Sequence, residues 1–267
     1  MATSIIVNGA LGKMGKEILY IALNDPEVRL VGCMEYPGHP AMGKDVGFAL
    51  GWEPLRIELQ SDCTALPVAD SVVIDFSSPQ STAALLKQTT SFKTAFVIGT
   101  TGIDGAGQKQ IELAAQTHPV VFSPNMSLGV NLLFHITELL SKKLGEDFDI
   151  EIIEAHHRLK KDSPSGTAKK LGEIAVAARG LQYDAAIKNG RVGMVGERTK
   201  KEIGMHAVRG GDIVGDHTVL FAAAGERLEL KHMAHSRATF ARGAVLAAKW
   251  LSAQKPGLYS MREVLGL

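Results

Sequence analysis

The chain contains 267 residues, which is enough for one large domain or two modest ones with a sizeable buried core. Hydrophobic residues make up 45% of the chain and charged residues 21%, an ordinary globular composition that excludes a disordered protein. The 29 lysines and arginines are balanced by 28 aspartates and glutamates, so the net charge of +1 lacks the basic excess that is typical of nucleic-acid binders and of proteins drawn to anionic membrane surfaces.

Short apolar runs alternate with amphipathic segments along the first half of the chain. Helical spacing predicts helices at 13–23 and from about residue 81, and the apolar runs predict strands at 4–8, 28–34, 71–76, 95–98 and 120–122. Continuous apolar strands that alternate with helices are typical of a parallel sheet with both faces covered. The first half therefore predicts an α/β fold of the Rossmann-like, doubly wound type.

A different pattern begins after Ser127. It predicts helices at 130–144 and 167–178, and strands at 149–154, 203–209, 213–222 and 227–232. Gly210-Gly211 and Gly225-Glu226 separate the last three strands and predict hairpin turns between them. We therefore expect a second α+β domain with a mixed or antiparallel sheet, followed by a helix at 240–252 that packs back on the first domain.

The turn after the first strand has three glycines in a GxxGxxG pattern, one residue longer than the usual GxGxxG. Its residues are Gly9, Ala10, Leu11, Gly12, Lys13, Met14 and Gly15. Such a turn lets the backbone approach a pyrophosphate, and the following helix offers N–H groups to that anion. Glu35 ends the second strand, 20 residues after Gly15, where a carboxylate accepts hydrogen bonds from ribose hydroxyls. These features predict a dinucleotide site, and the alternative is a glycine-rich turn beside a surface glutamate.

Two further loops follow predicted strands. Their residues are Gly99, Thr100 and Thr101 in one loop, and Ser123, Pro124, Asn125 and Met126 in the other. Ligands of a doubly wound sheet bind outside the carboxyl ends of the strands. We therefore expect both loops to line the nicotinamide side of the crevice, although Gly-Thr-Thr-Gly is also typical of an ordinary turn.

Residues 151–168 combine an apolar strand, a basic cluster and a turn into a helix. Histidine and Lys160 would supply proton donors and positive charge, and the helix start at Gly166-Thr167 would bind a carboxylate. The segment therefore predicts a pocket for a small anion. The alternative for His156-His157 is a metal pair or a solvated loop. Adjacent histidines at a strand end point to opposite faces, and no cysteine or closely spaced carboxylate pair completes a zinc set, so we expect no metal.

The cysteines and the N-terminus indicate the compartment. Cys33 and Cys63 are too few for a disulfide framework, and reduced thiols in a reducing cytoplasm are the simpler interpretation. The first four residues contain no basic n-region, and no apolar run is long enough to span a bilayer. We therefore expect a cytoplasmic protein with no membrane partner; a plastid location would apply only to a plant protein, and no transit peptide is seen.

The segment 151–168 resembles the signature of the dihydrodipicolinate reductases, also called 4-hydroxy-tetrahydrodipicolinate reductases, of the diaminopimelate route to lysine. That signature runs Glu, Ile or Val, any, Glu, any, His, three any, Lys, any, Asp, any, Pro-Ser-Gly-Thr-Ala, and this chain matches every specified position. The resemblance also covers the glycine loop, Glu35, both later loops and residues 237–240. It therefore extends over the whole chain.

The resemblance implies a two-domain enzyme that uses NADH or NADPH to reduce the ring of a small dicarboxylate to tetrahydrodipicolinate. The dinucleotide-binding domain would comprise residues 1–126, completed by the C-terminal segment 237–267. Residues 127–236 would form the substrate domain, whose sheet is the usual contact of a homotetramer. No nucleic-acid partner is expected.

The resemblance also implies roles for individual residues. His156 and Lys160 would be the catalytic acids, and the groups that hold the substrate carboxylates would be His157, Gly166 and Thr167. The sequence leaves open which acid delivers the proton, and whether Arg237 binds substrate or makes only a structural pair at a helix start. The alternatives are another reductase on the same fold and a non-catalytic dinucleotide sensor, but the intact acids and anion-binding turn favour an enzyme.

The choice between NADH and NADPH depends on residues near Glu35. A carboxylate repels a ribose 2′-phosphate, and many family members follow this acid with an arginine that binds the phosphate. Here the next residue is the uncharged Tyr36, whereas Lys13 in the glycine loop and, more weakly, His39 are the remaining candidates. We therefore expect both cofactors to work, with NADH somewhat preferred.

Overall fold

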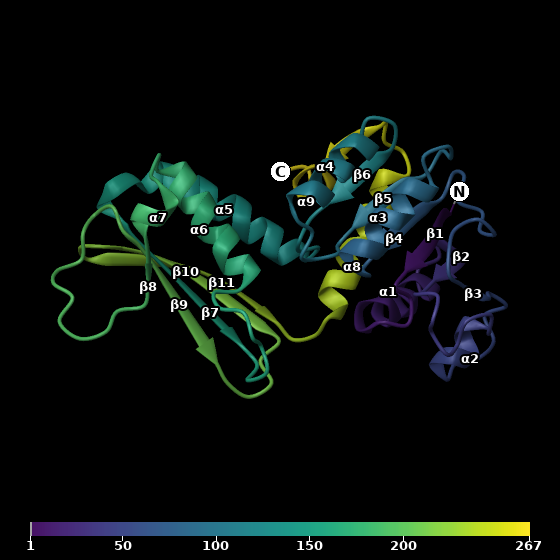
Figure 1. The fold of residues 1–267 in the computed structure, drawn as a ribbon. Helices are drawn as coiled ribbons and strands as arrows, with labels where there is room; N and C mark the ends of the chain where they lie inside the picture. Colours follow the sequence, from purple (N-terminus) through teal and green to yellow (C-terminus); the bar gives the residue numbers. More distant parts are fainter. Residues whose placement is uncertain (1) are drawn as a thin grey trace. The chain divides into compact units, whose positions relative to one another are not determined.

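The computed structural model describes residues 2–267, whose contacts divide the chain into two compact units (Figure 1). The first unit runs up to Leu128 and resumes over Arg237–Leu267, and the second comprises Gly129–Ser236. The chain thus leaves the first unit two residues after the expected boundary at 126, and it returns at Arg237.

A seven-stranded sheet forms the centre of the first unit. Every pairing in it is parallel, and the strand order is β12-β6-β5-β4-β1-β2-β3. The strands are β1 (Thr3–Asn8), β2 (Val28–Met34), β3 (Leu59–Gln60), β4 (Val72–Asp75), β5 (Ala95–Ile98), β6 (Pro119–Phe122) and β12 (Gly257–Tyr259). The order reverses at β1, which confirms the predicted doubly wound sheet. The short strands β3 and β12 were not predicted.

Helices cover both faces of this sheet because its strands are apolar on both sides. Ile5 and Val7 of β1 belong to a core with α1 (Lys13–Leu23) and α8 (Ala238–Leu251). Ile6 points the other way, into a core with α3 (Pro79–Gln88) and α4 (Gly105–Ala114). Helix α8, yellow in Figure 1, contacts β4, β5 and β6. The closing helix is therefore part of the nucleotide-binding unit, which also contains α2 (Val46–Leu50) and α9 (Met261–Val264).

The second unit has a five-stranded mixed sheet in the order β11-β10-β7-β9-β8. Its elements are α5 (Leu128–Leu144), a 3₁₀ turn (Gly145–Asp147), β7 (Asp149–His156), α6 (Gly166–Ala178), α7 (Tyr183–Ala186), β8 (Ile187–Asn189), β9 (Ile203–Arg209), β10 (Gly215–Ala223) and β11 (Glu226–Ala234). Strand β7 is parallel to β9 and antiparallel to β10. One face of the sheet shares a buried core with α5 and α6.

The two predicted hairpin turns have different outcomes. Ala223 pairs with Glu226, so a tight turn joins β10 to β11, and Gly225 within it has a φ of +87°, a left-handed conformation that favours glycine. The prediction of a hairpin at Gly210-Gly211 is wrong. Strand β7 lies between β9 and β10, so the glycine pair belongs to a connection that crosses the end of β7.

An ion-pair cluster around Glu151 stabilises the other face of this sheet. Its carboxylate accepts hydrogen bonds from Arg191, Arg198 and His206 at 2.7–3.0 Å. Burial raises the pKa of Glu151, but these three donors outweigh burial and lower the pKa from 4.5 to about 2. The ionised carboxylate therefore contributes to folding above pH 4.5, and that contribution is lost as the pH falls towards 2.

Glu151→Gln is expected to lower the free energy of unfolding at neutral pH by about 3 kcal/mol, because a pKa shift of this size corresponds to that energy. Urea denaturation should show a difference from the wild type that shrinks as the pH is lowered below 4.5. Glu229→Gln is the control, since Glu229 pairs with Arg227 while both side chains are more than half exposed; a change below about 0.5 kcal/mol is expected there. Equal effects of the two substitutions would contradict the role of the cluster.

Within residues 2–267, no helix combines the length and the apolar character that a membrane crossing requires.

Candidate active site

The glycine loop after β1 is shaped by close backbone contacts. Gly9 has a φ of +76°, and a Cβ atom on it would lie 2.9 Å from the carbonyl oxygen of Phe76. A Cβ atom on Gly15 would lie 2.1 Å from the carbonyl oxygen of Gly9. Only glycine fits at these two positions, so the loop folds tightly against the start of α1. Gly12 is the N-cap of this helix and brings no side chain that would compete for its N–H groups.

Glu35 lies beside the glycine loop, as the spacing predicts for a ribose ligand. Its Oε2 atom accepts a hydrogen bond from the backbone N–H of Leu11 at 3.0 Å, and its Oε1 atom accepts one from Tyr36 at 3.2 Å. Lys13 of the glycine loop and Tyr36 are both exposed. His39 accepts a hydrogen bond from Ala41 at Nδ1, so that nitrogen carries no proton.

A hollow of about 280 Å³ lies at the carboxyl ends of β4, β5 and β6. Its lining residues are Met14, Phe76, Ser77, Gly99, Thr100, Thr101, Pro124, Asn125, Met126 and Phe240. The structure therefore brings the glycine loop and both later loops to one edge of the sheet. Ser123 lies below this surface and bonds to the carbonyl oxygen of Asn125 at 2.8 Å.

Asp75 organises these loops and was missed by the sequence analysis. It ends β4, is completely buried, and accepts hydrogen bonds from Asn8, Ser77 and Thr82. Burial raises the pKa of Asp75, and the hydrogen bonds offset part of that effect. The sequence did contain one signal for Asp75, because it lies near the end of a predicted strand, as Glu35 does.

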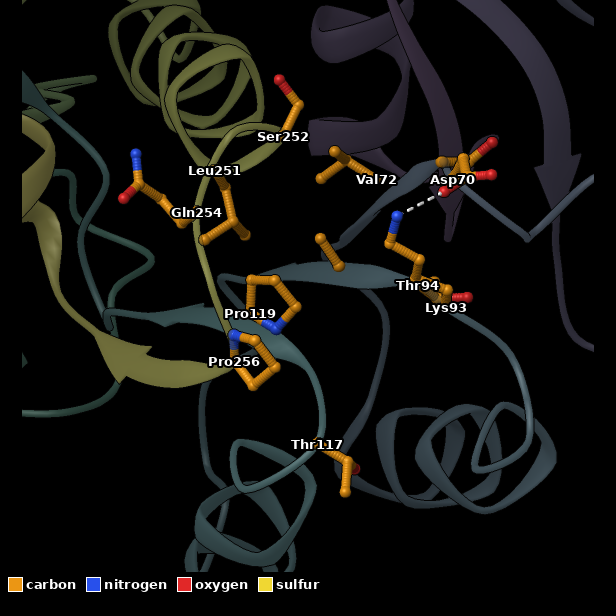
Figure 2. Close-up of a pocket in the computed structure, with 12 residues that line it drawn as sticks. Asp70, Val72, Lys93, Thr94, Thr117, Pro119, Leu251, Ser252, Gln254 and Pro256 are labelled. Atoms are coloured by element: carbon orange, nitrogen blue, oxygen red, sulfur yellow. Dashed lines mark ion pairs between the residues drawn. The ribbon is translucent and has the colours of Figure 1, made fainter.

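A separate cavity of about 180 Å³ lies at the opposite, amino ends of β4, β5 and β6 (Figure 2). Its walls include Val72, Pro119 and Leu251, and an exposed ion pair joins Lys93 to Asp70 at 3.2 Å on one side. Ligands of parallel α/β sheets bind at the carboxyl ends of the strands. The hollow beside the glycine loop is therefore the candidate nucleotide site.

A buried carboxylate and a histidine form the centre of the second unit's candidate site. Alternation along β7 turns Glu154 and His156 towards the face that the helices cover. Glu154 is 0% exposed and His156 8%. The Nδ1 atom of His156 lies 2.7 Å from the Oε2 atom of Glu154. The two NH groups of Arg209 bond to the two carboxylate oxygens at 2.7 and 2.8 Å, and the backbone N–H of Ser165 adds a bond at 3.0 Å.

These contacts determine the charges of the pair. Burial raises the pKa of Glu154, but the hydrogen bonds from Arg209, His156 and Ser165 outweigh it, so the net pKa is lowered and the carboxylate is ionised. Burial lowers the pKa of His156 below 6.5, and this effect exceeds the opposing effect of Glu154. At neutral pH the imidazole is therefore mostly neutral and donates from Nδ1.

His217 of β10 completes this cluster and was not predicted. It pairs across the sheet with Glu154, and its ring packs edge-on to that of His156 with centroids 5.2 Å apart. Its Nε2 atom lies 3.0 Å from the hydroxyl oxygen of Ser165. Burial lowers the pKa of His217 to about 3, so this ring stays neutral. Arg209 was also missed, because it is separated from its partner Glu154 by 55 residues.

Lys160 lies in the loop that follows β7. Its ammonium group is 2.9 Å from Asp162, and its side chain is 21% exposed. The loop folds back through a bond of 3.1 Å from the N–H of Lys160 to the carbonyl of His157. His157 is half-buried, and its Nδ1 atom has no hydrogen-bond partner within residues 2–267.

The proposed anion-binding turn is the first turn of α6. Ser165 is the N-cap, and its hydroxyl accepts a hydrogen bond from Ala168 at 3.2 Å. Gly166 and Thr167 are the first two helical residues, and the space where a Cβ atom of Gly166 would lie is open. Arg237 is an exposed N-cap residue of α8 and belongs to the first unit.

A doubly wound nucleotide-binding unit, joined to a mixed-sheet unit that carries a histidine, a lysine and a helix start, defines a dinucleotide-dependent oxidoreductase. Two family models match the chain: dihydrodipicolinate reductase, N-terminus, over residues 3–126, and dihydrodipicolinate reductase, C-terminus, over residues 129–265. The chain belongs to the dihydrodipicolinate reductase family.

Similar proteins support this assignment over nearly the full length. The 4-hydroxy-tetrahydrodipicolinate reductase of Syntrophus aciditrophicus is 47% identical, with 98% of this chain and 97% of the relative covered. The same enzyme of Geotalea uraniireducens is 47% identical, with 98% of each covered. A dipicolinate-bound dihydrodipicolinate reductase from Paenisporosarcina sp. TG-14 has the same fold, with a TM-score of 0.75, 21% identity, and coverage of 98% and 99%.

Proposed function

We propose that this chain reduces the dihydrodipicolinate ring, presented as 4-hydroxy-tetrahydrodipicolinate, to tetrahydrodipicolinate in the diaminopimelate route to lysine. The relatives named 4-hydroxy-tetrahydrodipicolinate reductase, which match over nearly their full length, and the two family models support this class of reaction. The observation that carries the proposal is the grouping of His156, Lys160 and the start of α6 on one unit, because the reaction needs an acid beside a site for carboxylates.

The nucleotide-binding unit fits NADH or NADPH. The tight glycine loop leaves backbone space for a pyrophosphate, Glu35 would bind a ribose, and the hollow beside Thr100 and Asn125 would hold the nicotinamide. When bound, the reduced nicotinamide supplies a hydride to an unsaturated ring carbon.

The second unit would bind the dicarboxylate and supply the proton. The N–H groups of Gly166 and Thr167 would hold one carboxylate, with His157 near the same loop. Positive charge from Lys160 would offset the two carboxylates and the charge that develops on the ring. Addition of hydride to one ring atom requires a proton at its neighbour, which Lys160 or protonated His156 would donate. Arg237 remains a candidate for a further anion contact.

The test is an assay with freshly made product of dihydrodipicolinate synthase. The purified chain should cause loss of the reduced nicotinamide absorbance when this product is added, and none without it. No loss with either cofactor would overturn the proposal and favour a non-catalytic dinucleotide sensor. Turnover of other conjugated imines or aldehydes, without turnover of this substrate, would favour a different reductase.

We expect NADH to be preferred over NADPH by on the order of tenfold in kcat/KM, because no arginine follows Glu35 to bind a 2′-phosphate. Both values should be measured at one ionic strength, for the wild type and for Lys13→Ala. A strong preference for NADPH that collapses in Lys13→Ala would show instead that Lys13 replaces the missing arginine.

A homotetramer in the cytoplasm is the assembly and location we propose. The sheet face opposite α5 and α6 exposes Ile153, Val208 and Met233, and such an apolar surface is typical of an interface between copies. Light scattering coupled to size-exclusion chromatography measures the mass directly, and a monomer would contradict the proposal.

A further inference from the structure

Glu154 has more hydrogen-bond donors around it than an ordinary ion pair requires. Its two carboxylate oxygens accept from His156, from both NH groups of Arg209 and from the backbone N–H of Ser165, all within 3.0 Å. The carboxylate has no exposure to solvent. A buried charge of this kind is retained only when its partners are fixed in place, so Glu154 and its donors form one rigid group.

The first consequence concerns the proton on the His156 ring. A carboxylate has only acceptors, so the nitrogen that faces it must carry a hydrogen. The Nδ1 atom therefore donates to Glu154, and in the neutral ring the Nε2 atom has a lone pair. This second nitrogen faces Gly215, where a Cβ atom would come within 3.0 Å of it. Packing against β10 and against the edge of His217 thus fixes the plane of the ring.

The second consequence concerns the loop that carries Lys160. Arg209 bonds to Glu154 and also donates to the carbonyl oxygen of Asp162 at 2.7 Å. Asp162 in turn holds the ammonium group of Lys160. The bond from Ser165 fixes the other end of the same loop, directly before the first turn of α6. One carboxylate therefore anchors the loop on which the second acid lies at two points, at Asp162 through Arg209 and directly at Ser165.

We propose that Glu154 is a positioning residue for the proton-delivery site: it holds the Nδ1–H tautomer of His156, so that the ring takes up a proton at Nε2 and donates it from there, and through Arg209 it holds the Lys160 loop. The catalytic consequence rests on the proposed reductase function, whereas the tautomer is a property of the resting protein. The charged and titratable groups around His156 are Glu154 on β7, Arg209 on β9, His217 on β10 and Lys160 in the loop. Glu154 is the only one of these four bonded to Nδ1.

Nitrogen NMR of the histidine rings tests the tautomer without any ligand. In uniformly ¹⁵N-labelled protein at mildly alkaline pH, His156 should show a protonated Nδ1 and an unprotonated Nε2, with its signals assigned by their loss in His156→Gln. Glu154→Gln should populate the Nε2–H form, because an amide can donate to Nδ1. Arg209→Lys should keep the Nδ1–H form, since the carboxylate remains.

Steady-state kinetics test the catalytic consequence of this positioning. Glu154→Gln should lower kcat by on the order of 10²-fold, with the KM for NADH unchanged within about twofold. Glu173→Gln is the control, because Glu173 is exposed and pairs with Lys170 on α6; its tautomer spectrum and kcat should equal those of the wild type.

A wild-type spectrum with Nε2–H would overturn the proposal even if Glu154→Gln fails to fold. An unchanged tautomer together with an unchanged kcat in Glu154→Gln would also overturn it. If the wild type shows the Nδ1–H form but no turnover of the proposed substrate, the proposed function fails and the positioning role stands.

Discussion

Replacing Lys160 with alanine is expected to lower kcat by roughly 10²–10⁴-fold while the Kd for NADH changes little. In the proposed mechanism the ammonium group is one of two acids in the second unit, and its charge would offset that of a bound dicarboxylate. Its contact with Asp162 and its low exposure give it a defined position before substrate binds. The Kd for NADH should not change because the glycine loop, where we propose that the dinucleotide binds, belongs to the first unit.

His156→Gln should have an effect of similar size, since it removes the other proposed acid. Steady-state kinetics measure kcat for both variants, and fluorescence titration measures the Kd for NADH. Lys161→Ala is the matched control, because Lys161 is the next lysine in the loop and is exposed; its kcat should be close to that of the wild type. A double variant of Lys160 and His156 with nearly wild-type activity would exclude both residues from the mechanism.

The pH profile of Lys160→Ala tests the contribution of His156. Burial lowers the pKa of His156 below 6.5 in the free protein. A histidine that donates a proton must first be protonated, so the residual kcat/KM of this variant should fall as the pH rises through that lowered pKa. A residual activity that does not depend on pH would assign proton delivery in this variant to another group.

Gly15→Ala is expected to weaken NADH binding by at least on the order of 10²-fold, and to lower the Tm. The added methyl carbon would lie 2.1 Å from the carbonyl oxygen of Gly9 and 2.5 Å from that of Ala10, so the backbone of the loop must move away from the position in which we propose that it holds the pyrophosphate. Because both clashing atoms belong to the backbone, no change of side-chain rotamer relieves them.

Calorimetric titration with NADH and thermal unfolding would measure these two effects. Gly105→Ala is the control, because Gly105 begins α4 in the same unit and has open space where the new methyl group would lie. It should retain the wild-type Kd and Tm within error. A wild-type Kd in Gly15→Ala would show that the pyrophosphate does not bind against this loop.

Local patterns were sufficient to predict most of the first unit. The strands β1, β2, β4, β5 and β6 are continuous apolar runs because both faces of the sheet are buried. Strands β3 and β12 have two and three residues and lie at the two edges of the sheet, so they carry too little periodicity to be recognised. Helix α4 begins with Gly-Ala-Gly, which weakens the helical pattern at its start.

Long-range pairing limited the prediction of the second unit. The sequence places β9 and β10 next to each other, and nothing local shows that β7 inserts between them. The same insertion brings Arg209 and His217 to Glu154 from strands more than fifty residues away. The sequence could propose His156 and Lys160 as a pair because they lie in one short motif, whereas the partners that surround them in the structure depend on strand order.

The route of the chain through the first sheet has a consequence for synthesis in the cell. Helix α8 supplies Ala241, Ala244, Val245 and Leu251 to a core shared with β1, and β12 adds the edge strand beside β6. Both come from the C-terminal part, so a nascent polypeptide that has emerged only as far as the second unit leaves one face of the parallel sheet covered by α1 but not by α8. The nucleotide-binding unit, although translated first, is completed last. Until then, the apolar residues that α8 covers in the finished protein are exposed, and exposed apolar surface of this kind favours aggregation during folding.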